Sequence, residues 1–128
     1  MKKLTFIAAF IVLLIALAAC SGPAAKLEQA DNGKTVDLKT GDTFTVSLEG
    51  NPTTGYSWEV AGIEPAIVEL VGEPDYKSDS NLIGSGGMFK FTFKTVAPGT
   101  SNVKLVYHRA WEEEIAPLYE YGVVVNVK

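Results

Sequence analysis

Three short segments that lie far apart in the chain carry residue types suited to binding another protein. They are Asn51-Pro52-Thr53-Thr54-Gly55-Tyr56, Gly84-Ser85-Gly86-Gly87 and Arg109-Ala110-Trp111. Each segment stands between stretches with the pattern of β-strands, so we expect each to be a loop. If the strands form a two-sheet sandwich, all three loops could emerge at one end and make a single surface.

The first segment has the composition of a rigid turn. Pro52 fixes its own φ at about −65° and biases Asn51 towards extended geometry. Thr53 and Thr54 are stiff at χ1, and Gly55 permits a positive φ or the close approach of another backbone. Such a loop suits insertion into a narrow cleft, because it loses little entropy on binding. Taken alone, the segment is explained more simply as a well-made hairpin turn without a partner.

The other two segments each allow a functional and a structural interpretation. The stretch 84–87 would let an extended peptide lie against a partner's backbone, or would form a plain hinge. No following helix or lysine supports a phosphate-binding loop there. Trp and Arg are enriched at interface hot spots, so Trp111 is either an exposed anchor or a cap on the core. Arg109 could pair with one of the three acidic residues 112–114.

The rest of the chain offers no apparatus for catalysis. His108 is the only histidine and Cys20 the only cysteine, so nucleophilic catalysis would depend on one histidine that we expect to be solvated or paired across strands. Zinc needs several His or Cys ligands. Weak calcium binding by residues 112–114 with Asp75 and Asp79 is the remaining alternative. We therefore expect no enzyme activity, no cofactor and no metal.

The N-terminus has the pattern of an export signal. Lys2 and Lys3 precede a mostly apolar run over residues 4–19, which is short for a membrane span of about 20 residues. The run ends in Leu17-Ala18-Ala19-Cys20, which resembles a bacterial lipobox, where the cysteine carries the lipid. An ordinary cleavage site followed by a free thiol is the alternative. A lipidated Cys20 predicts anchoring to a bacterial membrane in the cell envelope, the outer one if two are present, facing the periplasm or the exterior.

These boundaries leave one folded domain. We assign residues 1–19 to a signal peptide, 20–32 to the lipidated cysteine and a flexible tether, and 33–128 to the domain, which lacks a disulfide. Without Lys2 and Lys3 the chain has nine basic and fifteen acidic residues, a net charge of −6. This charge argues against nucleic acid and anionic membrane surfaces as partners, and a monomer is the simplest state.

Alternating apolar and polar residues predict an all-β domain of about seven strands. The expected strands are 35–38, 43–49, 56–60, 67–71, 88–95, 102–108 and 121–127. The polar stretch 72–87 is expected to be a long loop. Short strands separated by Gly and Pro turns are typical of an immunoglobulin-like β-sandwich, with a jelly roll or a small closed barrel as alternatives.

The order and spacing of the three loop segments resemble those of the chagasin-type inhibitors of papain-like cysteine peptidases. In that family the motifs N-P-T-T-G-[YF], G-x-G-G and R-P-[WF] lie on three loops at one end of an immunoglobulin-like sandwich. The first two motifs match fully, and the resemblance covers about 35–128. Ala110 stands where the family usually has proline, which removes a φ restraint beside Trp111.

The resemblance implies reversible, non-covalent inhibition by steric blockage. The first loop would enter the peptidase cleft, with Thr53, Thr54 and Gly55 near the catalytic cysteine of the peptidase. The second loop would lie along the cleft. Trp111 would pack on an apolar patch, with Arg109 supporting that loop or pairing with the enzyme. The partner would be a papain-like peptidase of the organism itself or of a host.

Two other functions are compatible with the composition. A surface adhesion or carbohydrate-binding sandwich would group Trp111, Tyr119 and Tyr121 on one flat face for stacking on sugars. A purely structural domain in an envelope complex would need no loop motif at all. Neither alternative explains why three loop sequences match one inhibitor family together.

Overall fold

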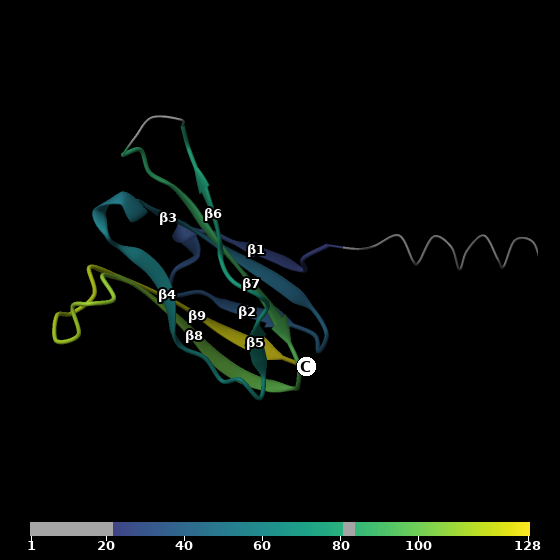
Figure 1. Ribbon diagram of the computed structural model, residues 1–128. Coiled ribbons are helices and arrows are strands. Elements are labelled where there is room, and N and C mark those ends of the chain that lie inside the picture. Colours follow the sequence, from purple (N-terminus) through teal and green to yellow (C-terminus); the bar gives the residue numbers. More distant parts are fainter. Residues whose placement is uncertain (1–21, 81–83) are drawn as a thin grey trace, which may run out of the picture.

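The structure, a computed structural model, describes residues 22–80 and 84–128 as two packed β-sheets (Figure 1). One sheet contains β1 (Ala25–Leu27), β3 (Thr43–Gly50), β7 (Gly87–Thr95), β5 (Val68–Leu70) and β6 (Asp75–Ser78). The other contains β2 (Thr35–Leu38), β9 (Tyr119–Val127), β8 (Gly99–His108) and β4 (Ser57–Gly62). Two short 3-10 turns, η1 (Gln29–Asp31) and η2 (Pro52–Thr54), complete the described part. The predicted all-β sandwich is confirmed, and each expected strand overlaps an observed one.

The prediction of one long loop over residues 72–87 is wrong. β6 lies within it and pairs antiparallel with β7, from Asp75 opposite Lys90 to Ser78 opposite Gly87. All four β6 residues are exposed, so no alternation of apolar residues marks the strand in the sequence. Backbone hydrogen bonds to the edge of β7 hold it, together with the Tyr76 ring, whose centroid lies 4.9 Å from that of Phe89. The connection is therefore a hairpin with a shorter tip.

The flexible tether predicted for residues 20–32 is likewise too long. β1 pairs in parallel with β3, from Ala25 opposite Phe44 to Leu27 opposite Val46, and the side chain of Leu27 is buried. The Tyr121 hydroxyl donates a hydrogen bond of 2.9 Å to the Glu28 carbonyl. The folded unit thus includes residues from Ala25 onwards. Cys20 and the apolar run before it lie outside the described residues, and none of the helices that the structure does describe could span a membrane.

The core lies between the inward faces of the two sheets. Phe44 stacks on Phe93 with ring centroids 5.0 Å apart, and large buried side chains each contribute about 1.5–3 kcal/mol to stability. The Trp58 indole donates a hydrogen bond of 2.9 Å to the Glu49 carbonyl, which joins β4 of one sheet to β3 of the other. The apolar residues that alternate along the longer strands are buried, as their period of two predicts. They include Phe44, Val46, Leu48, Phe89, Phe91, Phe93, Val103, Leu105 and Tyr107.

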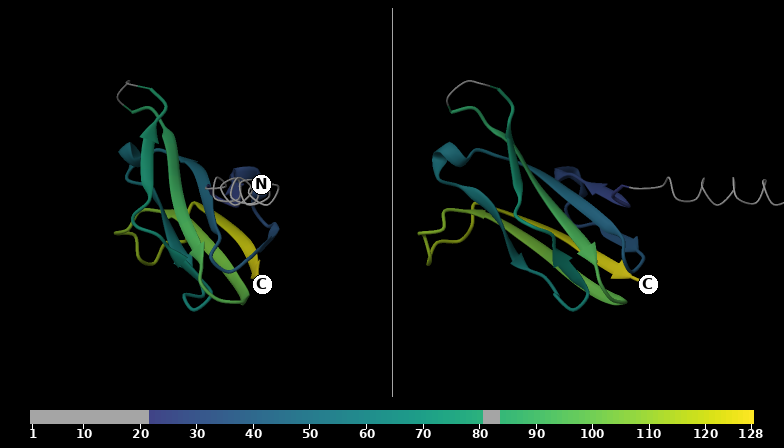
Figure 2. Two further views of the ribbon diagram at one scale, coloured as in Figure 1. Left: turned by 90° about the vertical axis from the view of Figure 1, so that its right-hand side faces the viewer. Right: turned by 45° about the vertical axis from the view of Figure 1, so that its right-hand side comes forward.

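Strand register brings three connections to one end of the sandwich. Gly50, the last residue of β3, pairs with Gly87, the first of β7. Ser57, the first residue of β4, pairs with His108, the last of β8. The η2 turn, the described end of the β6–β7 hairpin and the β8–β9 loop therefore lie together, while the described chain begins and ends at the opposite end (Figures 1 and 2). This arrangement allows the three loop segments to form a single surface.

Alkaline solution should destabilise the domain through Tyr121. Burial, with the nearby charge of Asp31 adding to it, raises the pKa of Tyr121 to about 12. Because the folded pKa lies above the usual value of about 10, the stabilisation is complete below pH 10 and disappears between about pH 10 and 12. Urea unfolding at pH 8 and pH 11 measures the loss of unfolding free energy. Tyr121→Phe should flatten this decline, whereas Tyr76→Phe should retain it; equal pH profiles for all three proteins would contradict the assignment.

Candidate functional site

The first predicted loop is a single, internally bonded 3-10 turn. The Asn51 carboxamide oxygen accepts hydrogen bonds from the Thr53 amide at 3.1 Å and the Thr53 hydroxyl at 2.5 Å. The Thr54 hydroxyl donates to the Asn51 carbonyl at 2.6 Å. Gly55 ends the turn with φ of 85°, in the left-handed region, and its amide donates to the Pro52 carbonyl. These internal hydrogen bonds therefore hold the loop in one conformation in the unbound protein.

Tyr107 of β8 ties this turn to the core. Its hydroxyl accepts a hydrogen bond of 2.8 Å from the Asn51 amide. Its ring stacks on Tyr56 at 5.3 Å and packs against Trp58 at 5.1 Å. In the sequence, Tyr107 is only one of the alternating apolar residues of the expected strand 102–108. A tyrosine in place of phenylalanine at the end of a core-facing row was the available signal, because a buried hydroxyl needs a partner.

The second predicted loop lies against the first. The Asn51 side-chain amide donates a hydrogen bond of 2.9 Å to the Gly84 carbonyl. A Cβ atom on Gly86 would lie 3.3 Å from the Gly50 carbonyl oxygen. A Cβ on Gly87 would lie 2.7 Å from the Tyr76 hydroxyl and would also collide with the β6 backbone. Close packing, rather than hinge flexibility, thus requires glycine at Gly87, where the hairpin strands meet.

The third predicted loop reaches back to the first through Arg109. The Arg109 Nε donates a hydrogen bond of 3.1 Å to the Thr54 carbonyl, and its Cζ lies 4.4 Å from the centre of the Tyr56 ring. Its Nη1 lies 3.3 Å from a carboxylate oxygen of Glu112, which confirms the expected pairing with this acidic run. The Glu112 amide donates to the Arg109 carbonyl at 3.0 Å, closing a tight turn around Trp111. One arginine therefore fixes two loops relative to each other.

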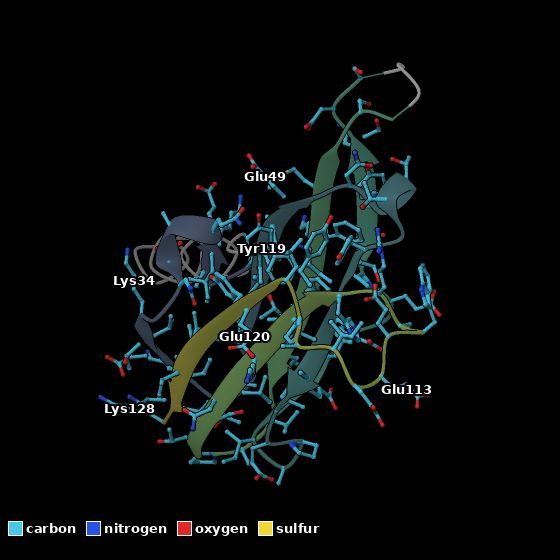
Figure 3. The ribbon with its side chains drawn as sticks, turned by 90° about the vertical axis from the view of Figure 1, so that its left-hand side faces the viewer. Lys34, Glu49, Glu113, Tyr119, Glu120 and Lys128 are labelled. Atoms are coloured by element: carbon cyan, nitrogen blue, oxygen red, sulfur yellow. The ribbon has the colours of Figure 1, made fainter. Side chains whose placement is uncertain are left out.

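Trp111 is an exposed side chain rather than a cap on the core. It is 69% exposed, whereas Trp58 is 4% exposed. The indole lies over Gly55, so close that a Cβ atom there would be 2.5 Å from Trp111 Cη2. All three predicted segments, Asn51–Tyr56, Gly84–Gly87 and Arg109–Trp111, consequently meet in one surface at the end of the sandwich. Figure 3 looks onto this end.

The His108 imidazole, next to the third loop, has a structural partner. His108 Nε2 lies 2.6 Å from Glu59 Oε2 on the neighbouring strand, as expected for a cross-strand pair. Within residues 22–80 and 84–128 there is no cluster of three His, Cys, Asp or Glu side chains that could hold a metal. Tyr121 is 2% exposed, so it does not share an open face with Trp111 and Tyr119. The flat aromatic face that sugar binding would require is thus incomplete.

Comparison with known proteins matches this chain to one family. The family described as chagasin family peptidase inhibitor I42 matches residues 37–125. Chagasin of Trypanosoma cruzi is 36% identical over 90 residues, which cover 67% of this chain and 82% of chagasin. The crystal structure of a cysteine protease inhibitor from Entamoeba histolytica has a TM-score of 0.71 and 25% identity, covering 84% of this chain and 100% of that one. The ICP of Leishmania mexicana has a TM-score of 0.59 and 35% identity, covering 77% and 90% respectively.

Proposed function

This chain belongs to the chagasin family of peptidase inhibitors, and we propose that it reversibly inhibits papain-like cysteine peptidases by filling their active-site cleft. The family is one of inhibitors rather than enzymes. The observation that carries the proposal is the joining of three loops into one surface through Asn51, Gly55 and Arg109. A surface assembled before binding loses little entropy when it docks.

Each loop has a distinct part in this proposal. The η2 turn is the wedge, because its exposed tip carries Pro52, Thr53 and Thr54 on a backbone fixed by internal hydrogen bonds. The Gly84–Gly87 segment offers backbone groups to the peptidase along the cleft. Trp111 supplies an apolar anchor beside the wedge, and Arg109 holds that anchor in place. The blockage is steric, so no bond forms or breaks.

Titration of papain and cathepsin L with protein of residues 21–128 tests the proposal. This protein contains every element of the sandwich. We expect complete, reversible inhibition below micromolar concentration, competition with substrate, and recovery of uncleaved inhibitor. Thr54→Arg, which enlarges the exposed tip of the wedge, should weaken inhibition without unfolding the domain. Absence of inhibition at micromolar protein would reject the proposal for these two peptidases and leave the adhesion alternative, which a glycan array would examine.

Replacing Ala110 by proline should strengthen inhibition by about two- to fivefold. Ala110 occupies the second position of the turn closed by Glu112 and Arg109, where proline is favoured. Proline there would restrict the free loop and reduce the entropy lost on binding, and a two- to fivefold change corresponds to about 0.4–1 kcal/mol of binding free energy. Inhibition constants of the two proteins against papain give the comparison. Weaker inhibition by Ala110→Pro would show that the turn needs a geometry that proline does not allow.

We further propose that Cys20 carries a lipid that anchors the protein to a bacterial membrane. The lipobox-like segment Leu17–Cys20 supports this, and only four residues separate Cys20 from β1. The Ala24 amide donates to the Thr43 carbonyl at the start of β3, at the end opposite the loops. An anchor at Cys20 would therefore leave the inhibitory end pointing away from the membrane.

The anchoring proposal is tested in a bacterial expression host. We expect labelling of the wild-type protein by an alkyne fatty acid and its recovery with membranes, both lost in Cys20→Ser. Protease treatment of intact cells would then report whether the domain faces the exterior or the periplasm, and hence whether host peptidases could reach it. Size-exclusion chromatography with light scattering of residues 21–128 tests the expected monomer. Membrane recovery without any label would instead indicate an uncleaved signal.

A further inference from the structure

Tyr119 is a rigid aromatic side chain that the three loop motifs do not include. Among the residues that the structure describes, the large apolar side chains that are more than half exposed all fall within 111–119. Tyr119 is one of them at 57% exposure, yet it is the first residue of β9 and pairs with Tyr107. Its ring stacks on the Tyr107 ring at 5.9 Å, and the Leu118 amide donates to the Tyr107 carbonyl. An aromatic ring fixed this firmly and left open to solvent is typical of a contact residue.

Tyr119 and residues of the β6–β7 hairpin line a shallow groove of about 370 Å³. Gly50, Gly86 and Gly87 line it without side chains, which keeps it open. Glycine is required at Gly50, because a Cβ atom there would lie 2.7 Å from the Phe89 ring. Asn51 of the wedge also lines the groove, so the groove is continuous with the inhibitory surface.

Two acidic residues, Glu49 and Asp79, complete the lining of the groove. Neither forms an ion pair with any residue of the described ranges, whereas Glu112 of the same end is paired with Arg109. Figure 3 shows Tyr119 and Glu49 close together on the end that faces the viewer, with Glu113 of the β8–β9 loop well apart from them. The groove thus combines an exposed aromatic ring with unpaired negative charge.

We propose that this groove is a fourth contact region, which receives an arginine or lysine side chain from the margin of the peptidase cleft. The inference rests on the proposed inhibitory function. A guanidinium or ammonium group can lie on the Tyr119 ring while its N–H groups bond to the carboxylates. Arginine suits the site particularly, because its planar group both stacks and donates several hydrogen bonds. Because the groove adjoins Asn51, the margin of a cleft that takes in the wedge would face the groove.

This contact would select among peptidases. Trp111 lies over Gly55 at one end of the wedge, and the groove adjoins Asn51 at the other end. Trp111 and Tyr119 would therefore contact the peptidase on different sides of its cleft. A peptidase with an acidic residue at the matching position would meet Glu49 and Asp79 as like charges, which disfavours the wrong partner.

Papain inhibition by matched variants tests the groove. We expect Tyr119→Ala to raise the inhibition constant about tenfold and Tyr119→Phe to change it less than twofold, because the ring is the contact. The double variant Glu49→Gln/Asp79→Asn should raise it about fivefold and make the association rate less dependent on salt between about 50 and 500 mM NaCl. The control Glu64→Gln/Glu69→Gln removes the same charge away from the groove and should behave like the wild type.

The outcomes separate this inference from the function on which it rests. If the wild type inhibits papain and both groove variants remain within twofold of it, the fourth contact is wrong and the inhibitory function stands. If the wild type inhibits neither papain nor cathepsin L, the inhibitory function fails and the groove inference with it. Thermal unfolding would show whether Tyr119→Ala loosens the packing of Tyr107. If it does, the double variant Glu49→Gln/Asp79→Asn decides whether the groove binds the peptidase, because both of its substituted side chains are exposed.

Discussion

Gly55→Ala should reduce inhibition about a hundredfold while leaving the domain folded. Gly55 has φ of 85°, a conformation that strains a residue with a Cβ atom by about 1–2 kcal/mol. The new Cβ would also lie 2.5 Å from Trp111 Cη2, so the indole must move. The substitution therefore disturbs the wedge and the anchor together, and a hundredfold change corresponds to about 2.8 kcal/mol of binding free energy.

Gly41→Ala is the matched control for backbone strain. Gly41 has φ of 93° in the turn between β2 and β3, and a Cβ atom there would meet no heavy atom within 4 Å. Both variants should lose about 1 kcal/mol or more of unfolding free energy in urea, since both place alanine in the left-handed region. Only Gly55→Ala should raise the inhibition constant for papain. Equal inhibition by the two variants would show that the contact between Gly55 and Trp111 has no part in binding.

The strands that build the core were predictable because burial leaves a period of two in the sequence. Phe89, Phe91 and Phe93 alternate with Lys90 and Lys94, and the structure buries the aromatic residues and exposes the lysines. The same reasoning could not find β6, whose residues are all exposed. It also missed β1, where Leu27 is the only buried side chain. Both strands depend on backbone hydrogen bonds to a neighbour, and these leave no pattern in side-chain type.

The identity of the three loops was predictable, but their attachment to one another was not. Thr54 and Arg109 are 55 positions apart in sequence and meet only because β4 and β8 pair in a particular register. The hydrogen bond from Asn51 to Gly84 depends in the same way on the pairing of β3 with β7. Tyr119 belongs to none of the three loop motifs. Its exposure becomes informative only when the groove beside Asn51 is known.

Trp111→Ala should raise the inhibition constant about thirtyfold or more, because truncation of a hot-spot side chain costs about 2 kcal/mol or more of binding free energy. The indole is 69% exposed in the free protein, so its removal deletes little that stabilises the fold. Its contact with Gly55 holds it in place beside the wedge and lowers the entropy lost on docking. We therefore expect the loss to appear mainly as faster dissociation of the complex, because most effects of interface substitutions lie in the dissociation rate.

Val71→Ala provides the control for this second prediction. Val71 is an apolar side chain that is 44% exposed, and its amide donates to Thr92 of β7, away from the three loops. Its truncation should leave the inhibition constant unchanged within about twofold, since surface substitutions away from a contact have small effects. Surface plasmon resonance with immobilised papain would separate association from dissociation rates for both variants. If Trp111→Ala lowers the unfolding free energy as much as it lowers the binding free energy, the indole is a structural support of the loop. Recognition of the peptidase would then depend on Arg109 and the wedge, without an aromatic anchor.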